Sequence, residues 1–162
     1  MQRLLYFSGL VDRLNQRIGN SILWLILFTV LISAGNALVR KVFQVSSNAL
    51  LEVQWYLFSA VFLLGAGYAL LKNAHVRIDF VASHLSRRMV HWIEIVGILV
   101  FLLPLCVMLI DLSWSLVLNA WVSGEMSQNA GGLIRWPVYL LLPSGLALLL
   151  LQGIAELIKR IA

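Results

Sequence analysis

The sequence predicts an all-α integral membrane protein with four transmembrane helices. Only 12% of the 162 residues are charged and 61% are hydrophobic, whereas a soluble domain carries about 25% charged residues. Four long apolar runs account for this shortfall, at residues 21–39, 51–71, 92–118 and 136–158. Each run meets the requirement of about 20 mostly apolar residues for crossing a hydrocarbon core about 30 Å thick. Few residues remain for a second domain, so we expect one membrane domain over residues 1–162.

Helices are expected at all four runs. Each run is apolar on every face, whereas the strands of membrane barrels alternate apolar and polar residues over about 10 positions. A backbone in hydrocarbon must also satisfy its own hydrogen bonds, which a helix does within one segment. Pro104 and Pro143 lie inside the third and fourth runs. Each proline removes a backbone donor and is expected to bend its helix.

The segment before the first run has an amphipathic pattern. Its apolar residues recur at three- and four-residue steps: Leu4, Phe7, Val11, Leu14 and Ile18. Its polar residues fall largely on the other side: Arg3, Asp12, Arg13, Gln16 and Arg17. This period predicts a helix in the membrane interface, with extension of the first span into the headgroups as the open alternative. A second interfacial helix is predicted from the same spacing of Val81, Leu85, Met89 and Trp92.

The first run, residues 21–39, is expected to remain in the protein as a span. Ser33-Ala34-Gly35 resembles the small-residue site at which a signal peptide is cleaved, so cleavage is the alternative. However, the run is about 18 residues long, against roughly 7–15 for the apolar core of a signal peptide.

Basic residues outside the spans are divided unevenly between the two sides. One side carries nine of them: Arg3, Arg13, Arg17, Lys72, Arg77, Arg87, Arg88, Lys159 and Arg160. The other side carries three: Arg40, Lys41 and Arg135. The positive-inside rule therefore predicts that both termini and the second loop lie in the cytoplasm. These anchors explain the pI of about 9.9, and no basic stripe with interleaved aromatic residues indicates nucleic-acid binding.

Asp111 is the acidic residue placed deepest within a run. It lies about 9 Å along the helix from the centre of the third span. A charge at a helix centre costs roughly 2.5–3.5 kcal/mol, and less toward the ends. Asp111 is therefore either a coupling residue for ions or a carboxylate bonded to Ser115, to Trp114 or to a partner subunit. The structural alternative is favoured, because the spans hold no second deeply placed charge.

Other residues that often carry chemistry are explained by their positions. Glu52 and Glu94 open the second and third spans, where acids in a first turn complement the helix dipole. The three histidines all fall in the second loop: His75, His84 and His91. A transmembrane haem would need histidine ligands within the spans, and the spans contain none. No nucleophile–base pair, phosphate loop or metal cluster is evident in the sequence. We therefore expect no cofactor, no metal site and no enzymatic activity.

Small residues indicate where the helices approach one another. Ser33 and Ala37, and then Gly65 and Ala69, are pairs four residues apart, a spacing that lets membrane helices pack closely. These pairs predict a compact four-helix bundle. The single cysteine, Cys106, is interpreted as a small buried hydrophobic residue in the third span.

Short motifs follow one another in a fixed order along the chain. They are Glu52-Val53-Gln54-Trp55, Gly65-Ala66-Gly67-Tyr68, His75-Val76-Arg77-Ile78-Asp79, Glu125 with Ser127, Gly131-Gly132-Leu133 before Trp136-Pro137, then Pro143, Gly145 and Leu151-Gln152-Gly153. Together with four spans at this length, they resemble the small membrane subunit of tripartite ATP-independent periplasmic (TRAP) transporters, the DctQ family. The resemblance covers nearly the whole chain. One departure is Tyr139, where many relatives carry a lysine.

The resemblance implies a small permease subunit in a bacterial inner membrane. It would pair with a much larger, DctM-like membrane subunit that carries the substrate and sodium sites. A periplasmic substrate-binding protein would deliver an organic acid or a related carboxylate, and uptake would follow the ion gradient without ATP. The small subunit would then be a static scaffold among membrane lipids.

The polar residues at the two rims are the expected partner contacts. The inner set is His75, Arg77 and Asp79, and the outer set is Glu52, Trp55, Glu125, Ser127, Arg135 and Trp136. The alternative function is a stand-alone small oligomeric transporter that uses Asp111 for ion coupling. A membrane anchor for a redox complex is disfavoured by the lack of histidines within the spans.

Overall fold

The chain is helical in the computed structural model, which describes residues 1–44, 47–74 and 85–162. The elements are α1 (Gln2–Phe43), α2 (Asn48–Leu71), α4 (Arg87–Val96), the π-helical segment η1 (Gly97–Leu102), α5 (Leu103–Ser123) and α6 (Trp136–Ile161). No strand occurs among these described residues; an isolated bridge pairs Met126 with Ile134.

Four helices are long and apolar enough to cross a membrane, as predicted. They are α1, α2, the continuous helix Arg87–Ser123 formed by α4, η1 and α5, and α6. Each predicted run lies inside one of them. Neither flanking amphipathic segment is shown as an interfacial helix; Val81, at the start of the second segment, lies outside the described residues. The first forms the start of the 42-residue α1, and α4 leads directly into the third span.

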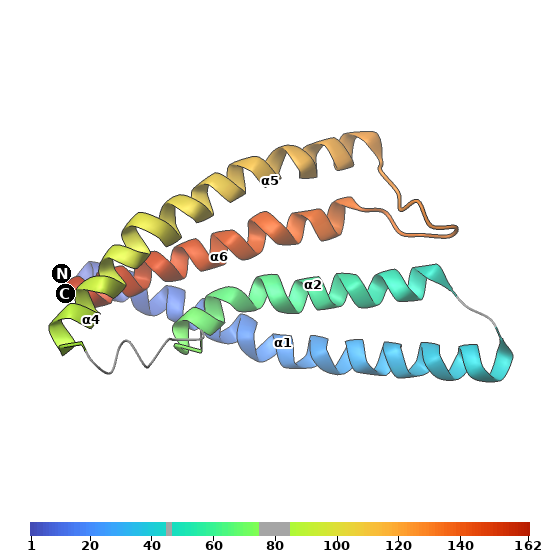
Figure 1. Cartoon of the computed structure of the whole chain (residues 1–162), viewed down its shortest axis with the longest axis horizontal. Helices are drawn as coiled ribbons and strands as arrows, with labels where there is room; N and C mark the ends of the chain where they lie inside the picture. The colour runs from blue at the N-terminus through green and yellow to red at the C-terminus, as the bar shows by residue number, and fades with distance from the viewer. Residues whose placement is uncertain (45–46, 75–84) are drawn as a thin grey trace.

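The helices form an open layer instead of the expected compact bundle. In the half of the molecule away from the termini, they lie side by side in the order α1, α2, α6, α5 (Figure 1). At the opposite end, called here the terminal end, the start of α1 crosses to pack on α6, and the two termini lie close together (Figure 1). The layer buries only 11–28% of the residues in the most apolar stretch of each span, which suits helices surrounded by lipid or a membrane partner.

The central contact of the layer, between α2 and α6, depends on glycine. A Cβ atom added to Gly145 would lie 2.5 Å from the carbonyl oxygen of Leu63. A Cβ added to Gly67 would lie 2.3 Å from Oδ1 of Asn15 and 3.1 Å from the carbonyl oxygen of Leu148. These glycines therefore let the backbones approach more closely than any other residue allows.

The predicted pairs of small residues are not the sites of closest approach. Ala37 is exposed, and a Cβ added to Gly65 would make only ordinary contact, 3.4 Å from Cδ1 of Ile22. Spacing alone identifies small residues but not the side of the helix that meets a neighbour. That side is decided by how the helices cross.

The buried face at the start of α1 only partly matches the amphipathic pattern. It includes Val11 of the apolar stripe together with small and polar residues, whereas Arg13 and Arg17 of the predicted polar side are exposed. The buried residues of this segment are Ser8, Val11, Asn15, Gly19 and Ile22. From the predicted apolar stripe, Leu4, Phe7 and Leu14 are exposed instead. In a membrane protein the apolar stripe can face lipid, so small and polar residues are free to form the helix contact.

The buried polar side chains of α1 are hydrogen-bonded to α6. Ser8 Oγ donates to the carbonyl oxygen of Ala155 at 3.2 Å, and Asn15 Nδ2 donates to Gln152 Oε1 at 2.8 Å. Gln152 Nε2 in turn donates to Oδ1 of Asp12 at 2.8 Å. Both Asn15 and Gln152 have no exposed surface. Because buried amides are costly without partners, this pairing fixes one register between α1 and α6.

Ion pairs continue this network toward the terminal end. Lys159 Nζ lies 3.1 Å from Oδ1 of Asp12 and 2.5 Å from Oε1 of Glu156. Arg160 pairs with Glu94, which ties α6 to α4. Glu94 therefore forms an interhelical ion pair, and the expected first-turn role is wrong, because α4 begins at Arg87 and has no acid in its first turn.

Substituting Gln152 by leucine is expected to destabilise the α1–α6 contact by about 1–3 kcal/mol, because Asn15 Nδ2 loses its best acceptor in a buried site. Thermal unfolding in detergent measures the loss. Gln16→Leu is the matched control, since Gln16 bonds Asn20 in an exposed pair; this substitution should cost less than about 0.5 kcal/mol. Equal melting temperatures for the two variants would contradict a stabilising role for the buried pair.

The third span contains a wide helical turn just before its proline. The π-helical segment η1 ends two residues before Pro104. In a regular α-helix the proline ring would clash with the carbonyl group four residues earlier. A π turn moves that carbonyl aside, and such turns commonly accompany bends. Figure 1 shows the resulting curve of α5. Cys106, in the next turn, is buried as predicted.

Candidate functional site

The loop between α5 and α6, residues 124–135, is folded into a hairpin. The N–H of Ser127 donates to the carbonyl oxygen of Leu133, and the N–H of Arg135 donates to that of Glu125, each at 2.9 Å. Gly124 and Gly131 adopt φ values of 62° and 71°, which residues with a Cβ rarely tolerate. The hairpin is therefore an ordered element that presents defined groups at this end of the molecule, called here the loop end.

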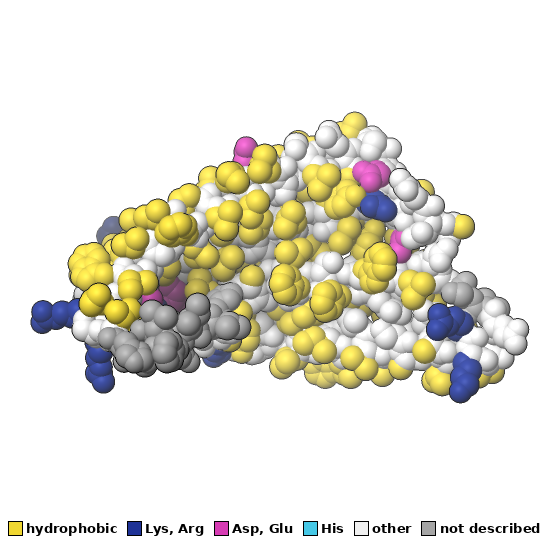
Figure 2. Space-filling view, viewed as in Figure 1, with side chains coloured by type: hydrophobic (Ala, Val, Ile, Leu, Met, Phe, Trp, Pro, Cys, Tyr) yellow, Lys and Arg dark blue, Asp and Glu magenta, His cyan; other side chains and the backbone are white. Residues whose placement is uncertain are grey.

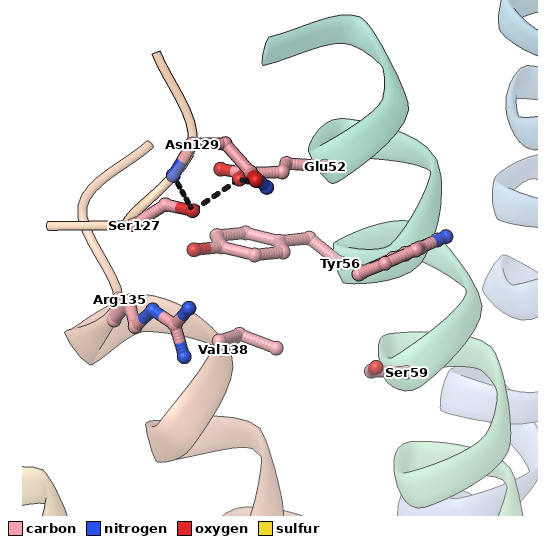
Figure 3. A pocket seen from close by; sticks show the side chains of 8 residues that line it. Glu52, Tyr56, Ser59, Ser127, Asn129, Arg135 and Val138 are labelled. Atoms are coloured by element: carbon pink, nitrogen blue, oxygen red, sulfur yellow. Dashed lines mark hydrogen bonds between the residues drawn. The ribbon is translucent and has the colours of Figure 1, made fainter. Parts of the chain in front are cut away.

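Glu52 of α2 holds this hairpin through both oxygens of its carboxylate. Ser127 Oγ donates a short hydrogen bond to Oε1, and Asn129 Nδ2 donates to the same oxygen at 2.8 Å. The backbone N–H of Leu133 donates to Oε2 at 2.6 Å. Figure 3 shows the Glu52, Ser127 and Asn129 side chains converging. We call these four residues the carboxylate clamp.

The clamp replaces the expected explanation of Glu52 by the helix dipole. Helix α2 begins at Asn48 and has no acid in its first turn, so Glu52 lies in the second turn. Its residue is only 5% exposed. A carboxylate accepts hydrogen bonds only, and three donors from the hairpin converge on this one. The sequence places Glu52 at a helix start, but only the fold brings the donors to it.

Two further bonds fasten the hairpin to α2. Asn48 Nδ2 donates to the carbonyl oxygen of Ala130 at 3.0 Å, and the Tyr56 hydroxyl donates to that of Ile134 at 2.9 Å. Tyr56 lies one helical turn after Glu52. The same face of α2 therefore holds the hairpin at several points, and the loop end behaves as one unit.

A second polar group lies beside the clamp. Arg135 Nη1 donates to the Tyr139 hydroxyl at 3.3 Å, and that hydroxyl donates to Glu125 Oε1 at 3.2 Å. Arg135 Nε also lies 3.9 Å from Glu125 Oε1. The hydrogen bond to Tyr139 raises the pKa of Arg135, so this guanidinium stays cationic. Tyr139, the departure from the family pattern, thus makes a polar contact itself.

These groups surround a cavity of about 190 Å³ at the loop end. It is lined by Glu52, Trp55, Tyr56, Ser59, Ser127, Asn129, Arg135 and Val138, as the close view in Figure 3 shows. Glu52 faces the cavity with three hydrogen bonds already made, two at Oε1 and one at Oε2. The groups that remain available to a partner are the Arg135 guanidinium and the indole of Trp55, which is 68% exposed.

The structure brings the predicted outer residues to one end of the layer. Glu52, Trp55, Ser127 and Arg135 share the cavity, with Glu125 paired to Arg135 beside it. Trp136 lies at the start of α6 and packs edge-to-face on Trp121, with ring centroids 4.6 Å apart. The predicted inner residues His75, Arg77 and Asp79, together with His84, lie outside the described residues.

Sequence reasoning missed Tyr56 and Asn129 as members of this site. Tyr56 is four residues after Glu52, so helical spacing alone would have placed it on the same face. Asn129 is two residues after Ser127, in a loop whose conformation no periodicity predicts. Gln152, noted only within a motif, is a buried partner of Asn15.

Other residues considered for chemistry are scattered. His91 is exposed on α4 and Asp111 is exposed on α5. Within the described residues, Asp111 has no hydrogen bond or ion pair, so the expected bonds to Ser115 or Trp114 are not formed. The described part of the chain holds no group of three or more His, Cys, Asp or Glu side chains suited to a metal ion.

Comparison with known proteins gives one match. The family model of the DctQ component of tripartite ATP-independent periplasmic transporters matches residues 29–162, which include all four predicted spans in whole or in large part. No curated protein and no solved structure matches the chain significantly.

Proposed function

The chain belongs to the DctQ family of tripartite ATP-independent periplasmic transporters, and from this premise we propose that it braces the large membrane subunit of such a transporter. Members of this family are components of transporters, and the family is not a family of enzymes. With four helices suited to a membrane, the chain is a small permease subunit. The match over residues 29–162 is the observation that carries the proposal.

The architecture supports a brace rather than a transport pathway. Transporters that bind ions at mid-membrane use broken helices and converging polar groups. In the described residues the spans are continuous helices, apart from the π turn of η1. The polar groups that are bonded between different elements collect at the two ends. An open layer also offers a partner a broad apolar face, such as that in Figure 2. We therefore assign sodium coupling and binding of an organic acid to the large subunit and the periplasmic binding protein.

The terminal end is proposed to face the cytoplasm of a bacterial inner membrane. Eight of the eleven Lys and Arg residues that the structure describes belong to the segments at this end. Segments rich in Lys and Arg tend to stay on the cytoplasmic side of the membrane, so this imbalance favours a cytoplasmic location for the terminal end. A reporter fused after Ala162 that works only outside the cytoplasm would contradict this orientation.

Gentle extraction of the tagged chain from its native membrane tests the proposal. Mass spectrometry should identify a large multi-span protein in the purified complex, and cells that lack this chain should lose uptake. The chain reconstituted alone should show no ion-coupled flux. Flux that disappears in the Asp111→Asn variant would instead support a stand-alone transporter.

The inner rim is tested in the same assay. We propose that His75, Arg77 and Asp79 contact the large subunit, because they form a charged motif between two spans. The double variant Arg77→Ala with Asp79→Ala should recover several-fold less of the large subunit than Arg40→Ala, a control at the loop end. Unchanged recovery and uptake would remove this contact from the proposal.

A further inference from the structure

Helix α5 forms one edge of the layer and has a well-defined inner side. It packs mainly on α6, through the buried residues Cys106, Ser113, Val117 and Ala120. At 100° per residue, these four side chains share one narrow face of the helix. The opposite side of α5 is therefore free of contacts with the other spans described.

Asp111 lies on that opposite side. It is about 150° around the helix from the buried face, and it is exposed. Its neighbours there include two exposed apolar residues, Met108 at 56% and Leu112 at 60%. Beside it, Asp111 borders a groove of about 400 Å³ together with Val107, Ile110, Trp114 and Leu150. Asp111 is thus the one charged side chain among the described residues of this mostly apolar surface, which also includes Ser115, whose hydroxyl donates to the carbonyl oxygen of Leu112.

The aromatic pair at the loop end shows how deep this carboxylate lies. Trp121 and Trp136 are in contact, and tryptophan prefers the boundary between hydrocarbon and headgroups. Asp111 is ten residues before Trp121, or about 15 Å along the helix. Half of a hydrocarbon core is about 15 Å thick. Asp111 is also about 9 Å along the helix from the centre of the third span, so it lies inside the hydrocarbon region.

We infer that this outward face of α5 is the docking face for the large membrane subunit, and that a basic side chain on one of its helices pairs with Asp111. The inference rests on the proposed function for the identity of the partner. Charge complementarity favours a protein partner over lipid on this face, because lipid tails offer a carboxylate neither a counter-charge nor a hydrogen-bond donor. A second copy of this chain would place two carboxylates opposite each other, and like charges disfavour that contact.

The test uses the complex of the tagged chain with its large subunit. Asp111→Asn should reduce recovery of the large subunit about ten-fold, and Asp111→Lys should abolish it. Met108→Leu, a neutral change one turn away, should leave recovery unchanged. An acidic substitution of the partner's basic residue should restore binding to the Asp111→Lys variant. Size-exclusion profiles of each variant establish that the chain itself remains folded.

Photo-crosslinking identifies the face independently of any loss of binding. A photoreactive residue at Ser115 on α5 should crosslink the large subunit, whereas one at exposed Leu27 on α1 should crosslink it much less. If the wild-type chain and the Asp111 variants recovered equal amounts of the large subunit, the docking inference would be overturned and the proposed function would stand. Crosslinks from Ser115 to lipid or to a second copy would also overturn it. Failure of the wild-type chain to recover any large subunit would overturn the proposed function as well.

Discussion

Replacing Gly145 by leucine is expected to abolish the stable fold of the layer, and replacing it by alanine to lower stability by about 1–3 kcal/mol. The added Cβ would lie 2.5 Å from the carbonyl oxygen and 2.7 Å from the carbonyl carbon of Leu63. Both atoms belong to the backbone of α2, so a side-chain rotation cannot relieve the contact. The helices must separate, and the centre of the layer must loosen.

Thermal stability in detergent, followed by size-exclusion chromatography after heating, measures this effect. The control is Gly35→Ala, since a Cβ at Gly35 has nothing within 4 Å. Gly65→Ala is an intermediate case, because its Cβ would make only an ordinary contact with Ile22. Gly145→Ala is expected to have the lowest melting temperature, well below those of Gly65→Ala and Gly35→Ala. If all three variants melted together, close backbone packing between α2 and α6 would not stabilise this protein.

Replacing Glu52 by glutamine is expected to release the hairpin of residues 124–135. The amide has the shape of the carboxylate but presents one acceptor oxygen and one donor group. Three donors, from Ser127, Asn129 and Leu133, now converge on the carboxylate, so at least one of them would face another donor. We expect the amide of Leu133 to exchange hydrogen about ten-fold faster or more, and partner recovery to fall as well.

Glu125→Gln is the matched control for this change. Glu125 belongs to the same hairpin, but its side chain is 43% exposed and lies 3.9 Å from Arg135. Exposed ion pairs of this kind contribute little to stability, so this variant should exchange hydrogen like the wild type. Comparable acceleration in both variants would mean that general loss of charge, and not the carboxylate clamp, governs the hairpin.

The sequence alone determined the class, the span number and the family. Hydrophobic length is a local property, because each span must bury its own backbone hydrogen bonds before any helix meets another. All four predicted runs accordingly lie inside the observed helices. The motif around Glu52 and the one around Ser127 were likewise recognisable, since they are short and contiguous.

The tertiary structure decided which face of each helix is used. In water an apolar stripe marks the core, but lipid is as apolar as leucine. At the start of α1, the apolar residues Leu4, Phe7 and Leu14 therefore face outward, and Asn15 forms the contact with Gln152. In the same way, Glu52 was visible as an acid at a helix start, but its partners lie 75 or more residues away. The packing of α6 on α2 and the fold of the hairpin bring them within hydrogen-bonding distance.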